Sequence, residues 1–231
     1  MQVGAAIFSL LALAAAAIPA QSPNSEAVVQ GLDAAVQARV DNVLAFTDTE
    51  RYAVYRDSDK SPAAQMTVRD TYRKGKGKTY AVLSESGSTV IEHFGLRPLL
   101  DNETEINLPD EVANSWFVSA NYRMQLKPGT QQVNGRACYA LSITPRRKAP
   151  NMIDGTLWVD ARNYSIVRVQ GVASKKPSIF AGTTHMMRDY ADIDGYSMAT
   201  RARAESDSFF FGRTVVVIRY DDYHLQLRPG Q

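Results

Sequence analysis

Apolar side chains recur at every fourth position early in the chain, with polar side chains between them. The apolar stripe consists of Val28, Leu32, Val36, Val40 and Leu44, and the other face carries Glu26, Gln30, Asp33, Gln37 and Asp41. This period predicts an amphipathic helix whose apolar stripe covers another element of the fold. Asn24 or Ser25 can cap the start of such a helix.

After this helix the chain mostly alternates apolar and polar residues, which is the period of a strand with one buried face. Tyr52 and Val54 belong to one such alternation, and Tyr80 and Val82 to another. Strands are predicted near residues 49–57, 64–73, 78–85, 88–94, 120–127, 136–144, 155–160, 164–172, 178–190, 195–206 and 211–225. Short turns separate most of them. The pattern therefore predicts an antiparallel meander of about eleven strands, curved so that few edges are exposed.

The alternation stops between Leu96 and Phe117, where Pro98 and an acidic stretch lie. Within this segment, the run from Leu108 to Val112 predicts a short helix with Pro109 in its first turn. The chain is thus mainly β, with an N-terminal and a mid-chain helix. An apolar helix against the concave face of a curved sheet leaves two alternatives, a core filled by side chains or a cavity for a ligand.

The N-terminus has the pattern of an export signal. Residues Ala5 to Ala20 carry no charge, and the apolar run ends in Ile18-Pro19-Ala20 before Gln21. We interpret residues 1–20 as a signal peptide and residues 21–231 as a single domain. The alternative is a buried N-terminal helix, which Pro19 disfavours. Since no cysteine follows the apolar run, we expect a soluble exported protein without a lipid anchor.

The composition and charge of the chain limit the kinds of molecule that it is expected to bind. The chain has 26 Lys and Arg against 24 Asp and Glu, a formal net charge of +2. This balance argues against nucleic acid, whose binding needs a concentrated basic face. The single cysteine, Cys138, excludes an intramolecular disulfide and lies in an apolar strand-like run, so we expect a buried thiol rather than a nucleophile.

The residues give little support to an enzyme. The chain has three histidines, His93, His185 and His224. His224 and Asp221 would point to opposite faces of a strand, and a second pair, His185 with Asp189, offers too few ligands for a metal. Motifs of serine hydrolases, zinc proteases and phosphate-binding loops do not occur. We therefore expect no catalytic residues, no metal and no cofactor.

Several motifs in the second half of the chain occur together in a known family. They are Trp116–Tyr122, Val133–Arg136, Tyr139–Arg146, Gly155–Asp160 and Tyr164–Gly171. Strands, a Pro with basic residues, and Leu-Trp-Val-Asp at a hairpin resemble the outer-membrane lipoprotein-sorting family, the LolA/LolB-like superfamily. The resemblance covers about residues 115–225. The lack of a cysteine after the leader departs from the lipid-anchored acceptor type of that family.

The resemblance implies a curved antiparallel half-barrel, with the helices covering its concave face around a hydrophobic cavity. It implies a periplasmic carrier that binds lipid or lipoprotein acyl chains, without a cofactor, for delivery towards the outer membrane. Two alternatives stay open: a non-enzymatic envelope sensor or protein-binding module on the same fold, and a hydrolase. On the carrier hypothesis, Val28, Leu32, Val36 and Val40 face Tyr139, Leu141 and Ile143 across the lipid cavity.

The strand count also predicts a membrane-contacting end of the sheet. Loops that leave even-numbered strands share one end of a meander. They carry Lys74, Lys76, Arg146, Arg147, Lys175, Lys176 and the aromatic run Phe209, Phe210 and Phe211. Loops at the other end carry Asp57, Asp59, Glu85, Asp160, Asp192 and Asp194. A basic end with aromatic side chains suits an anionic membrane surface. The alternative is that these are ordinary solvated hairpin tips.

Overall fold

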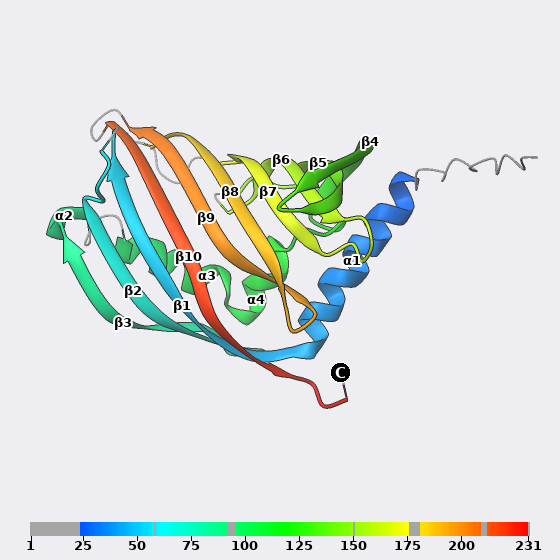
Figure 1. The fold of residues 1–231 in the computed structure, drawn as a ribbon, viewed down its shortest axis with the longest axis horizontal. Coiled ribbons are helices and arrows are strands. Elements are labelled where there is room, and N and C mark those ends of the chain that lie inside the picture. Colours follow the sequence, from blue (N-terminus) through cyan, green and yellow to red (C-terminus); the bar gives the residue numbers. More distant parts are fainter. Residues whose placement is uncertain are drawn as a thin grey trace, which may run out of the picture.

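An open antiparallel sheet forms most of the protein (Figure 1). The computed structural model describes residues 24–57, 59–91, 96–149, 151–175, 181–208 and 212–230. The strands are β1 (Val43–Arg56), β2 (Ala64–Arg73), β3 (Gly77–Gly87), β4 (Tyr122–Val133), β5 (Arg136–Pro145), β6 (Ile153–Asp160), β7 (Ile166–Ala173), β8 (Ala181–Ile193), β9 (Tyr196–Ser208) and β10 (Gly212–Leu227). The helices are α1 (Ser25–Asn42), α2 (Thr89–Ile91), α3 (Arg97–Ile106), α4 (Pro109–Val112) and the 3-10 turn η2 (Ala113–Ser115).

The spatial order of the strands is β3-β2-β1-β10-β9-β8-β7-β6-β5-β4, so the first and last strands pair in the interior of the sheet. The edge strands β3 and β4 follow one another in sequence but lie at opposite edges. The chain passes between them through α2, α3 and α4, and α3 and α4 lie on the inner side of the curved sheet in Figure 1. This curved, mainly β architecture confirms the predicted fold class.

Several details differ from the sequence prediction. Helix α3 (Arg97–Ile106) lies in a segment for which no helix was predicted, before the predicted short helix that contains Pro109. Thr89–Ile91 forms a helical turn instead of part of a strand at 88–94, so the described ranges contain ten strands and not about eleven. The sheet is also not a simple meander, because the helical passage from β3 to β4 interrupts it. Pro98 and Pro109 lie at the starts of α3 and α4, where a missing N–H costs nothing, whereas in a central strand it would break the pairing.

Helix α1 begins as predicted. Asn24 is its N-cap, and its side-chain Oδ1 accepts a hydrogen bond from the backbone N–H of Ala27 at 2.7 Å. The first half of the helix packs closely on the turn between β6 and β7. A Cβ at Gly31 would lie 2.5 Å from the ring of Tyr164, so only glycine allows this approach. The helix ends where Val43 begins β1, six residues before the predicted start of that strand at residue 49.

Two apolar clusters occupy the inner face of the sheet. The first joins Val28 and Leu32 of α1 to Leu141, Ile143 and other side chains of β4–β7. The second joins strands β1, β2, β9 and β10 to Leu96 and Leu100 around α3, with Tyr52, Val54, Met66 and Val68 among its strand members. None of the helices within the described ranges is long and apolar enough to cross a membrane.

Candidate functional site

A cavity of about 390 Å³ lies on the inner face, beside the second half of α1. Its walls come from α1, from β1, β3 and β8–β10, from the turn between β6 and β7, and from the segment between α3 and β4. The aromatic part of the lining includes Phe46, Trp116, Phe117, Tyr190, Tyr220 and Tyr223. The rest of the lining is in large part polar, with charged side chains such as Arg39, Glu103 and Arg188 and uncharged ones such as Asn107 and Ser115.

The polar part of the wall begins on β1. Phe46, Asp48 and Glu50 alternate along the strand, and all three line the cavity. The side chains of a strand point to its two faces in turn, so the inward face here carries two carboxyl groups. Asp48 is 1% exposed and Glu50 is 2% exposed.

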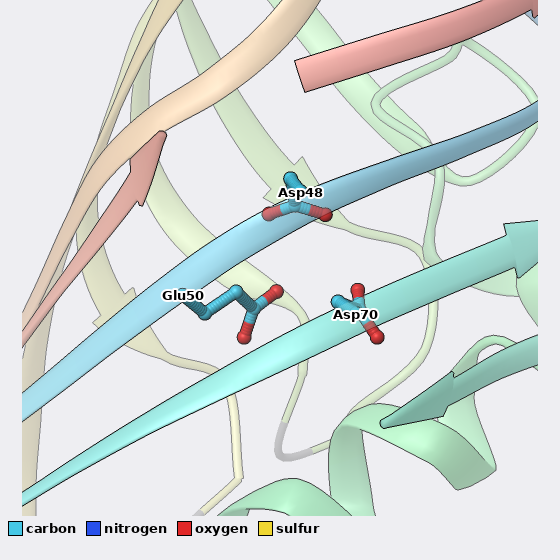
Figure 2. A group of neighbouring side chains, drawn as sticks. All are labelled: Asp48, Glu50 and Asp70. Atoms are coloured by element: carbon cyan, nitrogen blue, oxygen red, sulfur yellow. The ribbon is translucent and has the colours of Figure 1, made fainter. Parts of the chain in front are cut away.

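A third buried carboxyl group lies directly across from Asp48. In the pairing of β1 with β2, Asp48 is opposite Asp70. One carboxylate oxygen from each of Asp48, Glu50 and Asp70 lies within 4.8 Å of the others, and Figure 2 shows these side chains on the two neighbouring strands. Like charges opposite one another in neighbouring strands are destabilising, and burial strengthens the repulsion.

Lys78 supplies positive charge to part of this group. Its Nζ donates a hydrogen bond to Glu50 Oε1 at 2.6 Å and lies 2.6 Å from Asp70 Oδ2 and 3.8 Å from Glu103 Oε2. Burial alone would lower the pKa of Lys78, but Glu50 and Glu103 raise it above its ordinary value. Tyr52 donates its hydroxyl to Glu50, and burial together with that carboxylate raises the pKa of Tyr52. Lys78 therefore stays charged and holds Glu50 and Asp70.

Asp48 is left without a partner. Neither of its carboxylate oxygens makes a hydrogen bond, and no ion pair reaches it, among the residues that the structure describes. Burial and the neighbouring Glu50 raise the pKa of Asp48 to about 7, against the opposing effects of Lys78 and Arg69. At neutral pH this carboxyl group is therefore close to the midpoint of its titration.

The three carboxyl groups are hard oxygen donors of the kind that Ca²⁺ and Mg²⁺ prefer. The ammonium group of Lys78, however, already lies against Glu50 and Asp70, and it would repel a metal ion there. Of the histidines, His185 and His224 are exposed, and His93 lies outside the described residues. The prediction that the chain binds no metal stays a prediction.

The residues predicted to line a lipid cavity separate into three groups. Val36 lines the cavity described above. Val28, Leu32, Leu141 and Ile143 are fully buried together in the first apolar cluster, and Tyr139 packs against that cluster, stacked on Tyr164 with ring centroids 6.4 Å apart. Val40 is half-buried and belongs to neither the cavity lining nor the cluster. A lipid contact at any of these residues stays a prediction.

Sequence reasoning missed Asp48, Glu50 and Lys78. The strand was predicted from residue 49, so Asp48 fell outside it and the alternation from Phe46 to Val54 was not read as one inward face. Extending that alternation back from Tyr52 and Val54 places Asp48 and Glu50 on the apolar side. A carboxyl group at an otherwise apolar strand position is the signal that could have found this site.

The loops that were predicted to share a membrane-contacting end do not all lie together. The antiparallel order places the turn after β5, with Arg146 and Arg147, and the segment after β7, with Lys175, at one end of the sheet. The turn between β2 and β3, with Lys74 and Lys76, lies at the opposite end. The strand count failed here because Thr89–Ile91 forms a helical turn where part of a fourth strand was predicted.

The acidic loops are divided between the two ends as well. Asp57 and Asp59, which follow β1, lie at the end that carries Arg146. Asp192 and Asp194 lie at the end that carries Lys74. The other predicted contact residues, Lys176, Phe209, Phe210 and Phe211, lie outside the described residues.

Two other predicted residues have structural roles. Cys138 is fully buried, as expected, and burial raises the pKa of its thiol. Asp160, the last residue of the Leu-Trp-Val-Asp motif, is 1% exposed and accepts hydrogen bonds from Arg136 Nε and from the backbone N–H of Arg162, both at 2.7 Å. These two hydrogen bonds hold the turn between β6 and β7 against the start of β5.

Comparison with known proteins found neither a family model nor a curated protein that matches the chain. Solved structures do match. A LolA superfamily protein from Nitrosomonas europaea is 10% identical, with a TM-score of 0.46 over 90% of this chain and 96% of that one. A DUF1329 family protein from Desulfovibrio piger is 16% identical, with a TM-score of 0.45 over 88% and 94%.

A third structure, described as an outer membrane lipoprotein-sorting protein domain from Vibrio parahaemolyticus, is 16% identical, with a TM-score of 0.48 over 88% of this chain and 94% of that one. At these identities and TM-scores neither a family nor a ligand follows for this chain, so the ligand has to be argued from the cavity itself.

Proposed function

We propose that the protein is a periplasmic carrier that holds a lipid or lipoprotein acyl chain in the cavity of its curved sheet and delivers it towards the outer membrane. The observation that carries this proposal is the cavity of about 390 Å³, whose size falls within the range of small-molecule sites. Its walls come from several separate parts of the chain, so small movements of α1 or of the segment between α3 and β4 can admit a long ligand.

The aromatic lining supports an apolar cargo. Rings such as Phe46, Trp116 and Phe117 present large apolar surfaces at the cavity, and hydrocarbon binding needs no directional partner. Each buried methylene contributes about 0.8 kcal/mol, so a tail that buries ten of them gains roughly 8 kcal/mol before the costs of association. That gain is enough for a carrier to hold its cargo and still release it.

Two substitutions of neighbouring residues in α1 test the cavity. Ala35 lines it, whereas Ala34 is exposed to solvent. Ala35→Trp should fill part of the cavity and weaken the binding of the apolar probe N-phenyl-1-naphthylamine, measured by fluorescence. Ala34→Trp, the matched control, should bind the probe like the wild type.

The purified wild type should also carry lipid that native mass spectrometry and solvent extraction can identify. A folded wild type that never binds the probe and never carries lipid would contradict the carrier proposal. That result would favour the alternative of a sensor or protein-binding module on the same fold.

The periplasmic location rests on the predicted signal peptide, residues 1–20, which lies outside the described residues. N-terminal sequencing of the exported protein should begin at about Gln21. Finding Met1 on protein recovered from the periplasm would contradict the signal peptide and leave the cavity to be explained without export.

A further inference from the structure

The strongest unexplained feature of the cavity is the carboxyl group of Asp48. It is 1% exposed, lines the cavity, and has no hydrogen-bond partner for either oxygen among the described residues. A buried polar group without a partner costs several kcal/mol, and native proteins rarely retain one without a reason. Asp48 is among the residues that line the cavity, but both of its carboxylate oxygens are covered by neighbouring atoms, so a ligand contacts them only after a small shift of this wall.

Among the described residues, the side chains next to Asp48 give its carboxylate oxygens neither a hydrogen bond nor an ion pair. The only ammonium group beside the three carboxyl groups, in the part of the chain that the structure describes, is that of Lys78, and it already contacts Glu50 and Asp70 at 2.6 Å each. Asp70, directly opposite on β2, adds a like charge. The protein therefore places an unsatisfied acceptor next to further negative charge at the wall of a cavity that is lined in part by aromatic side chains.

Counting charges shows what is missing. The connected group contains four carboxyl groups, Asp48, Glu50, Asp70 and Glu103, and two cations, Lys78 and Arg188, the latter 3.4 Å from Glu103. A third cation, Arg39, also lines the cavity, but its Nε is directed to the sulfur of Met198 at 3.4 Å. Arg69, next to Asp70 on β2, also lowers the pKa of Asp48, but none of these cations forms an ion pair or a hydrogen bond with Asp48 among the described residues. The carboxyl group of Asp48 therefore has no direct cationic partner in this part of the chain.

We propose that this wall binds the cationic head group of an amphiphile, an ammonium group for which Asp48 is the counter-ion, while the apolar tail lies against the aromatic lining. The proposal rests on the proposed carrier function for the tail and adds the chemical class of the head group. An ammonium group donates hydrogen bonds to both free oxygens of Asp48 and supplies the missing charge. Phe46, two residues away on the same face of β1, adds an aromatic ring beside the cation.

A divalent metal ion is the competing occupant, and the geometry favours the amine. Ca²⁺ takes six to eight oxygen ligands and Mg²⁺ six. The carboxyl groups gathered here also have the ammonium group of Lys78 among them. An organic ammonium group needs only the two free oxygens of Asp48.

The test compares three ligands with the same tail: dodecylamine, dodecanol and dodecanoate. Their binding is measured at pH 8, below their aggregation concentrations, by displacement of N-phenyl-1-naphthylamine. A charge-assisted hydrogen bond should give dodecylamine at least a tenfold advantage over dodecanol, and dodecanoate should bind most weakly. Asp48→Asn should remove the advantage of dodecylamine over dodecanol. Asp59→Asn makes the same change at an exposed residue and is the matched control.

The outcomes separate this inference from the carrier proposal. Equal binding of the amine and the alcohol by the wild type overturns the head-group inference and leaves the carrier proposal standing, and this comparison does not depend on how the variant folds. Failure of all three ligands to bind contradicts the carrier proposal itself. Calorimetric titration with calcium chloride is the third measurement, and binding of Ca²⁺ that Asp48→Asn abolishes would assign the site to a metal and overturn the inference.

Discussion

The two halves of helix α1 lie against the same sheet, but the first half packs closely on it and the second half borders the cavity. The first half carries Val28 and Leu32, which are fully buried against Leu141 and Ile143 and leave no space between helix and sheet. The second half places Ala35, Val36, Ala38 and Arg39 at the wall of the cavity. Fully buried leucine and valine side chains stabilise the first region, whereas in the second region the helix borders a cavity.

The strands that face the two halves of α1 also differ in the polarity of their inward side chains. Opposite the first half of α1, the inward positions of β5 and β6 are apolar, as at Leu141 and Leu157. Beside the second half, the inward positions of β1 include Asp48 and Glu50. Natural proteins break the rules of core composition mainly where function requires it, so we expect the second region to bind the ligand and the first to stabilise the fold.

The largest effect on stability is expected from removing the cation of the cavity wall. Lys78→Met should lower the free energy of unfolding by about 3–5 kcal/mol, because Glu50 and Asp70 would remain buried without their partner. Urea denaturation measures the loss. Lys76→Met, at an exposed position of the neighbouring turn, is the control and should change stability by less than about 0.5 kcal/mol. Equal stability of the two variants would show that the carboxyl groups do not need Lys78.

Truncation of a side chain in the first apolar cluster should lower the free energy of unfolding but leave probe binding nearly unchanged. Leu141→Ala should cost about 3 kcal/mol of unfolding free energy, since it removes fully buried methyl groups and leaves a cavity in the first apolar cluster. Binding of N-phenyl-1-naphthylamine by the folded variant should stay within about twofold of the wild type. If the variant is fully folded but no longer binds the probe, the ligand occupies the first apolar cluster and not the cavity.

Asp48 should make stability depend on pH. Its pKa is about 7 in the folded protein and near 3.8 in the unfolded chain, so the folded state binds this proton more tightly. Its contribution to stability is therefore fully present below about pH 4 and is lost as the pH rises through 7. The groups that act on it are Glu50, Lys78, Arg69 and Glu103.

The variant Asp48→Asn removes this titration. The whole shift corresponds to about 4 kcal/mol, and screening by solvent in the cavity reduces it, so the variant should be about 2 kcal/mol more stable than the wild type at pH 8. The two proteins should converge near pH 4. Thermal unfolding across this range checks both points, and parallel curves for the two proteins would refute the raised pKa.

The smallest expected effect is on membrane binding by the lysine side chains at the two ends of the sheet. Lys148 and Lys175 are exposed at one end, and Lys74 and Lys76 are exposed at the other. If the first end contacts an anionic membrane, Lys148→Ala with Lys175→Ala should weaken vesicle binding by on the order of 1 kcal/mol per charge, whereas Lys74→Ala with Lys76→Ala should not. Co-sedimentation with anionic vesicles measures this. Equal losses in both double variants would point to non-specific attraction.

The sequence by itself determined the local elements. The fourfold period from Val28 to Val40 and the cap at Asn24 specify α1, since an amphipathic stripe can be buried only as a helix there. Alternation specified eight of the ten strands to within about three residues at each end, whereas β1 begins six residues before its predicted start and β4 ends six residues beyond its predicted end. Burial of Cys138 followed from its apolar neighbours in the same way.

Only the tertiary structure decided how these elements are arranged and where the cavity lies. Pairing of β1 with β2 and of β2 with β3, and the passage of the chain from β3 into α3, bring Asp48, Lys78 and Glu103 together. Local periodicity shows which face of a strand is buried, but it carries no information on which strand lies next to it. The packed and hollow regions of the inner face differ by the size and charge of side chains that meet only after folding.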